Sequence, residues 1–306
     1  MKRITTAALA GAALLFAGAA SAQQGVDFSK VEIKTTDLGN KTYMLEGQGG
    51  NITVALGTDG IIMVDSQFAP LHDKIKAAIE KISPLPIKFL VITHYHGDHV
   101  GGNAAFHKDG ATVVAHDNVR IRLAAGTTNA TTGAKIPPLP ADALPTETYM
   151  VGGKKLEVGG RVAQLNHVYT AHTDGDTWVA LPDANVIATG DIYGSRTYPN
   201  LDWGSGGTID GMILATETFL KAANDGTKIV PGHGPVATKA NLQEFHDMLV
   251  TARDRVKKLF DAGKSEQEVL AADPLADLNT KWAAPQGITS GPSFLRNVYN
   301  SFRNHN

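Results

Sequence analysis

Cysteine is absent from this sequence of 306 residues. No disulfide bond can form, so the folded chain has to be stabilised by its hydrophobic core. Thiolate metal ligands are excluded, and so is a lipid anchor attached to cysteine. Any metal site in this protein must therefore use imidazole and carboxylate groups.

The sequence also lacks a surplus of one charge, an internal repeat and a low-complexity segment. Its net charge is −2 and it has no run of basic residues, which excludes nucleic acid as the main partner. Beyond residue 22, no apolar run is long enough to span a bilayer, so we expect no stable membrane association. With 42% hydrophobic residues, the chain can bury a full core.

The first 22 residues have the organisation of a secretory signal peptide. Lys2 and Arg3 precede an apolar stretch at residues 7–20, and Ala20-Ser21-Ala22 has the small residues of a cleavage site. We therefore expect residues 1–22 to be removed after Ala22. The mature protein would begin at Gln23 and be exported to the periplasm.

Four strong metal-binding side chains lie within six residues, in the sequence His94-Tyr95-His96-Gly97-Asp98-His99. They follow an apolar segment, residues 87–93, that is predicted to form a buried strand, and α/β proteins usually carry their chemistry at such strand ends. Alternate residues of an extended chain point the same way, so His94 and His96 can bind one metal ion. Gly97 lets the chain bend and directs Asp98 and His99 toward a second metal ion.

Further candidate ligands stand beside small or turn-forming residues, in the segments Thr170-Ala171-His172-Thr173, Ala188-Thr189-Gly190-Asp191 and Pro231-Gly232-His233-Gly234. Together with the first motif, this order resembles the metallo-β-lactamase superfamily, whose pattern is HxHxDH followed by His, Asp and His. The resemblance covers roughly residues 42–236. It implies two zinc ions, one held by His94, His96 and His172, the other by Asp98, His99 and His233, with Asp191 bridging them.

The resemblance also implies a mechanism. Two zinc ions would convert a bridging water into hydroxide and polarise the bond that it attacks. Asp98 is the expected catalytic residue, because it could orient the hydroxide and pass a proton to the leaving group. Asp65 corresponds to a carboxylate that fixes the tautomer of a ligand histidine.

The remaining histidines need separate interpretation. His167 precedes His172 by five residues and is an alternative ligand, but the segment from Thr170 to Asp176 matches the family's loop, which favours His172. Five others lie in helical or surface contexts and are interpreted as structural: His72, His107, His116, His246 and His305.

The resemblance predicts a hydrolase that cleaves the carbonyl bond of a small molecule, a cyclic amide or ester such as a β-lactam or lactone. One group of true β-lactamases has cysteine where Asp191 stands here, so thioester or phosphoester hydrolysis stays open, as does zinc binding without turnover. Tyr193 and Arg196 follow Asp191 and are candidate substrate contacts, Tyr193 for an oxyanion and Arg196 for a carboxylate.

Periodicity predicts strands at residues 51–56, 61–65, 149–151, 155–158, 161–168, 177–181 and 186–188. It predicts helices near residues 71–82, 210–223 and 240–262, and a further helix starting at the capping pair Ser265 and Glu268. The resemblance implies an α/β fold, an αββα four-layer sandwich. We expect this hydrolase domain to span residues 23–239, and residues 240–306 to form a C-terminal helical extension packed on it.

Two features of the expected fold carry alternatives. Phe294, Val298 and Phe302 recur every four residues and could pack on the core or contact a second subunit. Residues 126–145 contain four prolines and are predicted to form a long loop, which could overhang the cleft.

Overall fold

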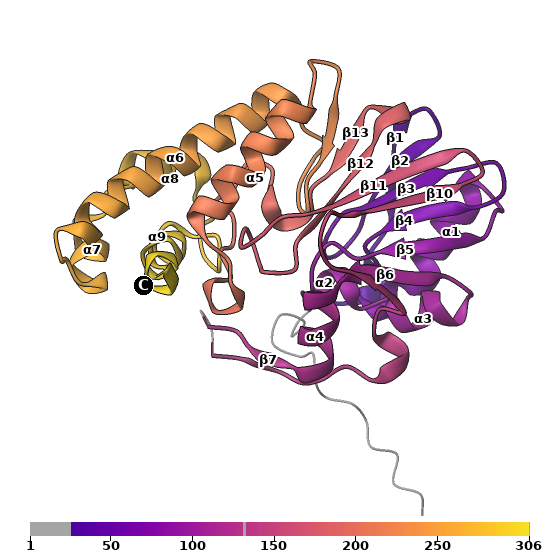
Figure 1. Cartoon of the computed structure of the whole chain (residues 1–306), viewed down its shortest axis with the longest axis horizontal. Helices are drawn as coiled ribbons and strands as arrows, with labels where there is room; N and C mark the ends of the chain where they lie inside the picture. Colours follow the sequence, from indigo (N-terminus) through magenta and orange to yellow (C-terminus); the bar gives the residue numbers. More distant parts are fainter. Residues whose placement is uncertain (1–25, 131–132, 306) are drawn as a thin grey trace, which may run out of the picture.

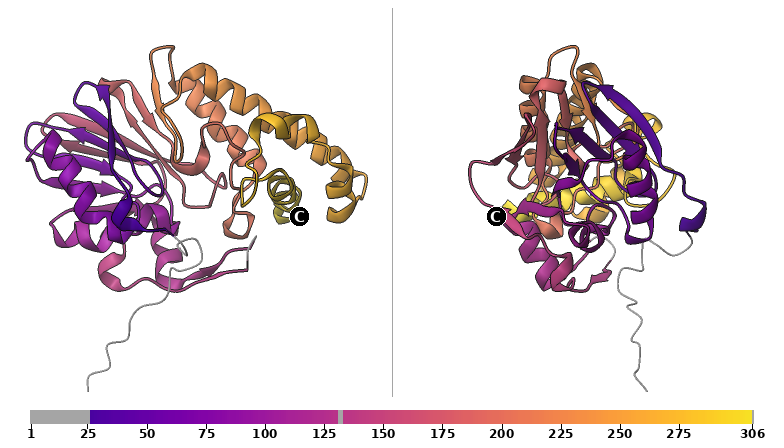
Figure 2. Two further views of the ribbon diagram at one scale, coloured as in Figure 1. Left: turned by 180° about the vertical axis from the view of Figure 1, so that it is seen from behind. Right: turned by 90° about the vertical axis from the view of Figure 1, so that its right-hand side faces the viewer.

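Two β-sheets lie face to face at the centre of the molecule, with helices on both outer faces (Figures 1 and 2). This computed structural model describes residues 26–130 and 133–305, so the predicted signal peptide lies outside the described residues. The four layers confirm the predicted αββα sandwich.

The first sheet has seven strands in the order β1-β2-β3-β4-β5-β6-β9. Their bounds are Lys34–Gly39, Thr42–Glu46, Ile52–Leu56, Ile61–Val64, Ile87–Val91, Thr112–His116 and Glu147–Tyr149. Strands β1 to β4 are antiparallel, whereas β4, β5, β6 and β9 run parallel. The carboxyl ends of these parallel strands therefore meet at one edge of the sheet.

The second sheet has five strands in the order β10-β11-β12-β13-β14. Their bounds are Lys154–Val158, Arg161–His167, Thr177–Leu181, Val186–Ala188 and Lys228–Val230. Only β13 and β14 are parallel, so Asp191 and His233, which follow these two strands, emerge at the same edge.

The strands predicted at residues 51–56 and 61–65 are confirmed as β3 and β4, which pair in a hairpin, and the strands predicted at residues 155–188 are confirmed as β10 to β13. The strand expected at residues 149–151 instead ends at Tyr149, and Met150 and Val151 are exposed. Strands β1, β2, β6 and β14 were not predicted.

Three buried clusters hold the four layers together. Between the sheets lie apolar side chains from alternate strand positions, among them Val64, Val91, Val179 and Val230. The outer face of the first sheet is covered by α1 (His72–Ile82), α3 (Asn103–Lys108) and α4 (Asp117–Ala125). Helix α1 buries Ile75, Ala78 and Ile79, the amphipathic stripe that predicted it.

The outer face of the second sheet is covered by α5 (Ile209–Ala222), α6 (Lys239–Asp261), α7 (Glu266–Ala272), α8 (Ala276–Trp282) and α9 (Gly291–Ser301), at the left of Figure 1. The helices predicted near residues 210–223 and 240–262 are confirmed as α5 and α6, and the predicted capping pair starts α7. Phe294 and Val298 are fully buried in this layer, so these side chains pack in the core of the chain. Helix α6 begins at Lys239, and the buried cluster joins residues on both sides of the boundary expected between residues 239 and 240; the division into a domain and an extension stays a prediction.

The long segment at residues 126–145 contains a short hairpin of β7 (Thr127–Thr128) and β8 (Lys135–Ile136). Ala130 lies against Gly204, in the connection between Asp191 and α5. Whether this segment overhangs a bound substrate stays a prediction.

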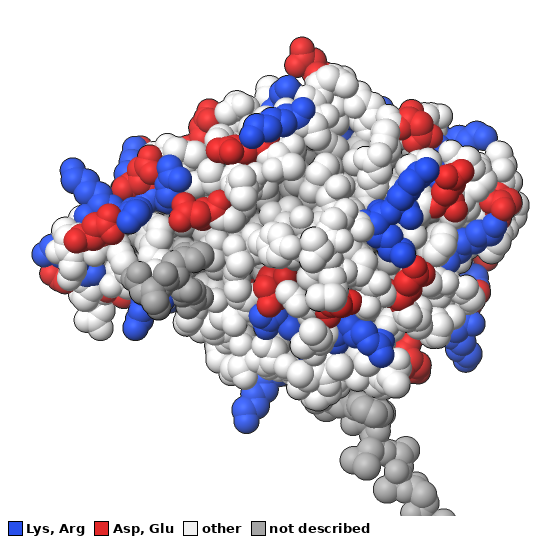
Figure 3. Space-filling model, viewed as in Figure 1, with Lys and Arg blue, Asp and Glu red and all other residues white. Residues whose placement is uncertain are grey.

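Lysine and arginine alternate with aspartate and glutamate over the face drawn in Figure 3, without a large patch of one sign. Within residues 26–130 and 133–305, no helix combines the length and the apolar character that crossing a membrane requires.

Candidate metal centre

The candidate ligands emerge where the parallel strands of both sheets end. Two residues separate β5 from His94, and the short helix α2 (Gly97–Val100) carries Asp98 and His99 in its first turn. His172 belongs to the connection between β11 and β12. Residues far apart in the sequence are thus brought to one edge of the sandwich.

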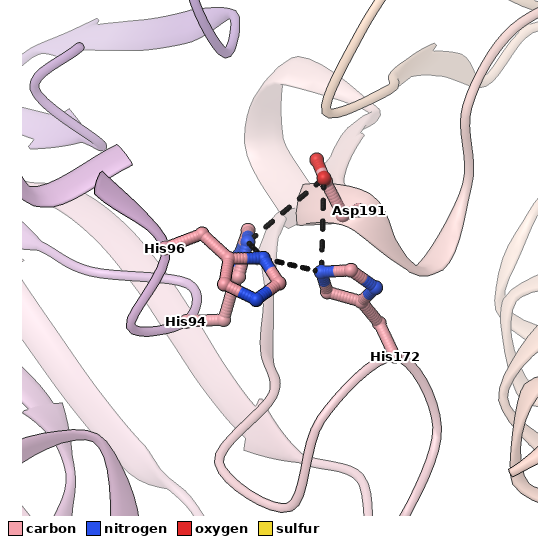
Figure 4. A group of neighbouring side chains, drawn as sticks. All are labelled: His94, His96, His172 and Asp191. Atoms are coloured by element: carbon pink, nitrogen blue, oxygen red, sulfur yellow. Dashed lines mark hydrogen bonds and ion pairs between the residues drawn. The ribbon is translucent and has the colours of Figure 1, made fainter. Parts of the chain in front are cut away.

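Four side chains form the first group: His94, His96, His172 and Asp191 (Figure 4). His96 Nδ1 lies 3.1 Å from His94 Nε2 and 2.9 Å from His172 Nε2. Asp191 Oδ2 lies 3.9 Å from His94 Nε2 and 3.7 Å from His172 Nε2. The ligand atoms all lie within 4.8 Å of one another, close enough to share one ion.

Asp98, His99 and His233 form the second group. His233 Nε2 lies 3.2 Å from Asp98 Oδ2. The other oxygen of Asp191, Oδ1, lies 3.1 Å from His99 Nε2 and 3.4 Å from His233 Nε2. Asp191 therefore directs one oxygen toward each group.

In four of the five ligand histidines, the ring nitrogen that faces away from the centre has a partner. His99 Nδ1 is 2.8 Å from Asp65 Oδ2, the contact predicted for Asp65, and His172 Nδ1 is 2.6 Å from the carbonyl of Asn200. His96 Nε2 is 3.0 Å from Asp202 Oδ2, and His94 Nδ1 is 3.0 Å from Thr93 Oγ1. Such partners orient the rings so that the opposite nitrogens offer their lone pairs inward.

The centre also contains buried polar atoms without a hydrogen bond, His99 Nε2 and Asp191 Oδ1. An unpaired buried polar atom is costly, and these two face each other with a geometry that does not form a hydrogen bond. A cation between them would satisfy both. The donor set therefore fits divalent metal ions, with imidazole and carboxylate ligands suited to zinc.

The electrostatics favour a neutral His172 and an ionised Asp98, which are the states that bind metals, but a protonated His233, whose proton a bound metal ion would have to displace. Burial and the neighbouring His96 lower the pKa of His172 to about 4. Burial raises the pKa of Asp98, but His99 and His233 outweigh this and bring it to about 2. Burial lowers the pKa of His233, yet the carboxylates of Asp191 and Asp98 raise it to about 10. Ionised carboxylates thus attract positive charge to this centre.

The structure separates the two alternative histidines. His172 lies in the first group, whereas His167 Nδ1 donates to the carbonyl of Asp176 at 2.9 Å. The ring of His167 stacks on His116 with centroids 3.6 Å apart. His167 therefore belongs to neither group of candidate ligands.

Within the described residues, no hydrogen bond or ion pair joins the side chain of Tyr193 or Arg196 to the side chain of a candidate ligand. The backbone of this segment does contact the loop of His233, since Gly232 N–H donates to the carbonyl of Tyr193 at 3.0 Å. The ring of Tyr193 is buried in the helical layer against Phe245, with centroids 4.9 Å apart. Both residues line a cavity of about 320 Å³ together with Lys281 and Trp282 of α8. Their contact with substrate stays a prediction.

Sequence reasoning missed Asp202, whose side chain is 2% exposed and touches His96. It lies 106 residues after His96, in an irregular connection without a motif. An isolated aspartate between Leu201 and Trp203 was the only signal available.

Comparison with known proteins identifies the family of this chain. The family model of the metallo-β-lactamase superfamily matches residues 45–233. The chain belongs to the metallo-β-lactamase superfamily. It is 25% identical over 191 residues to a type 2 metallo-β-lactamase from Bacillus sp. (strain 170), covering 62% of this chain and 68% of that protein. The chain is thus a metallo-hydrolase of this superfamily.

Solved structures of other proteins share the fold. A metallo-β-lactamase from Pontibacter korlensis matches with a TM-score of 0.58 at 20% identity, covering 72% of this chain and 99% of that one. The stereoselective inverting sec-alkylsulfatase Pisa1 from Pseudomonas sp. matches with a TM-score of 0.65 at 16% identity, covering 88% of this chain and 50% of that one.

Proposed function

We propose that this member of the metallo-β-lactamase superfamily is a binuclear zinc hydrolase that cleaves the carbonyl bond of a cyclic amide or ester, such as a β-lactam or a lactone. One observation carries the proposal: Asp191 presents one oxygen to each of two ligand groups. A carboxylate in that position can hold two ions close together.

Bound zinc would lower the pKa of water and polarise the scissile carbonyl, so no serine or cysteine nucleophile is required. His94, His96 and His172 would hold one ion, and Asp98, His99 and His233 the other. Asp98 and His233 have side chains that are 26% and 46% exposed, so this side of the centre faces the solvent and the incoming substrate. Asp98 can accept the proton of the attacking water and return it to the leaving group.

The choice of a cyclic amide or ester rests on the comparisons, because the family model matches residues 45–233, which hold the seven ligands, and a type 2 metallo-β-lactamase matches over 191 residues of this chain. A second candidate substrate is a sulfate ester. The match to the sec-alkylsulfatase covers 88% of the chain, a larger share than the residues before α6 make up, so it includes part of the C-terminal helical layer.

A substrate panel and a metal assay test the proposal together. Purified protein should bind two zinc ions per chain in native mass spectrometry, and a chelator should abolish turnover. The panel consists of nitrocefin, a homoserine lactone, a thioester, a nitrophenyl phosphodiester and a sec-alkyl sulfate.

Fastest turnover of nitrocefin or the lactone would support the first candidate, and fastest turnover of the sulfate the second. Full activity with a single ion would contradict the two-metal centre. Two bound ions without turnover of any ester, amide or sulfate would favour a zinc-binding protein that is not an enzyme.

We further propose that the protein is exported to the periplasm after cleavage behind Ala22. The support is the charge and apolar pattern of residues 1–22. N-terminal sequencing of the exported protein should begin at Gln23; an uncleaved chain in the cytoplasm would contradict this.

A further inference from the structure

His233 is the most exposed of the seven candidate ligands, with 46% of its side chain accessible. It stands between two glycines, and Gly234 has φ +95°, a conformation that favours glycine. A loop of this kind does not by itself hold a side chain in one position. The position of His233 therefore depends on contacts from outside its loop.

Asn51 contacts the loop on both sides of His233 in the sequence. Its Nδ2 donates to the carbonyl of Pro231 at 3.0 Å and to the carbonyl of Gly234 at 2.8 Å, and its backbone N–H donates to the carbonyl of Gly232 at 2.7 Å. Asn51 is 8% exposed and directly precedes β3, whose five residues are all buried. The loop of His233 is thus fastened to a rigid strand of the opposite sheet.

The residue before Asn51 contacts the other two members of the same ligand group. Gly50 N–H donates to the carbonyl of Asp98 at 3.1 Å, and Gln67 Nε2 donates to the carbonyl of Gly50 at 2.8 Å. Gly50 also packs on the ring of His99 so closely that a Cβ would lie 2.2 Å from its Cε1 atom. Residues 50–51 therefore connect Asp98 and His99 with His233.

We propose that Asn51 is a positioning residue for His233, and through it for the metal ion held by Asp98, His99 and His233. The proposal rests on the metal-dependent function proposed above. An asparagine suits this place because a primary amide has two N–H donors and two carbonyls accept them. Aspartate has the same shape but no donor, and its charge would face two carbonyl oxygens.

The test compares Asn51→Asp and Asn51→Ala with the wild type in the holoenzyme. The measurement is the dissociation constant of each zinc ion, in competition with a chelator. We expect the ion held by Asp98, His99 and His233 to bind about 10- to 100-fold less tightly in the Asn51 variants, the range seen when a residue behind a metal ligand is lost. The other ion should be unaffected, and Asn51→Asp should be impaired at least as much as Asn51→Ala.

Asn300→Ala is the matched control. Asn300 is 4% exposed and its Nδ2 also donates two hydrogen bonds, both of 3.0 Å, to Glu266 and Arg296 in the helical layer. This variant should lose thermal stability like Asn51→Ala but keep both zinc affinities. Equal loss of zinc affinity in both variants would mean that Asn51 acts only through general stability, which overturns the proposal.

A double-mutant cycle with His233→Ala tests whether Asn51 acts through His233. In the His233→Ala background, Asn51→Asp should cause no further loss of zinc affinity. An additive loss would overturn the proposed route.

Hydrogen exchange provides a readout that needs no metal. The backbone amides at residues 232–234 should exchange faster in Asn51→Asp than in the wild type or in Asn300→Ala. Unchanged exchange would contradict the positioning role. If the wild type binds no second ion but Asn51→Asp still exchanges faster at residues 232–234, the proposed function is contradicted. The role of Asn51 in holding the loop is then still supported.

Discussion

Asp202 accepts hydrogen bonds from the ring of His96 at 3.0 Å and from the hydroxyl of Tyr95 at 2.5 Å. Burial alone would raise the pKa of Asp202, but the hydrogen bond and the charge of His96 lower it well below its usual range. An ionised carboxylate at this place orients His96 so that Nδ1 faces the metal centre.

At the scale of the residue, we therefore predict that Asp202→Asn weakens the zinc ion held by His94, His96 and His172 by about 10- to 100-fold. Competition with a chelator measures this. Asp210→Asn removes a carboxylate that pairs with Arg253 on the surface and should change neither ion. Unaltered zinc binding in Asp202→Asn would show that His96 is oriented by its own backbone.

At the scale of the element, helix α6 links the sandwich to the C-terminal helices. Its N-terminus has a capping box, in which Thr238 Oγ1 accepts from Asn241 N–H and Asn241 Oδ1 accepts from Thr238 N–H. Further along, Phe245, Met248 and Leu249 are buried in the helical layer. The cap therefore supports a helix on which much of this layer depends.

Thr238→Ala should lower the free energy of unfolding by about 0.5–2 kcal/mol, because the first turn loses a hydrogen-bond acceptor. Urea denaturation measures the change. Thr251→Ala, in the interior of the same helix, should be neutral or slightly stabilising, since alanine has the higher helix propensity. Equal destabilisation by both substitutions would mean that the cap contributes nothing specific.

At the scale of the whole molecule, two stacked histidines join the two sheets. His116 ends β6 of the first sheet, His167 ends β11 of the second, and their rings are 3.6 Å apart and nearly parallel. Burial and the charge of His167 lower the pKa of His116, and burial lowers the pKa of His167, although Asp117 and Asp174 oppose these shifts. Both rings are therefore neutral in the folded protein at neutral pH.

A lowered pKa in the folded state means that the unfolded chain binds protons first. The contribution of this pair is fully present above the ordinary histidine pKa of 6.5 and is lost as the pH falls below it. We predict that the free energy of unfolding drops as the pH falls from about 7.5 to about 5, which is the range in which histidine titrates. The drop should be smaller in His116→Gln, and NMR titration should place the pKa of both rings below 6.5.

The metal-binding motif, the turn residues around the ligands and the amphipathic helices could be predicted from the sequence, because each depends on residues close together in the chain. The spacing of His94 and His96 follows from an extended backbone, and the stripe of α1 from helical periodicity. The resemblance carried by these motifs also predicted His172, Asp191 and His233, which the structure brings together with the first four ligands.

Only the tertiary structure decided what supports these ligands. Asn51 meets Pro231 across 180 residues and Asp202 meets His96 across 106, and neither contact has a local pattern that could reveal it. Strands β1, β2, β6 and β14 escaped prediction for a related reason, since their neighbours in the sheets define them more than their own periodicity does. The sequence by itself determined which side chains can bind metal, whereas the packing of two sheets determined where they meet, because pairing and burial act between residues that are distant in the chain.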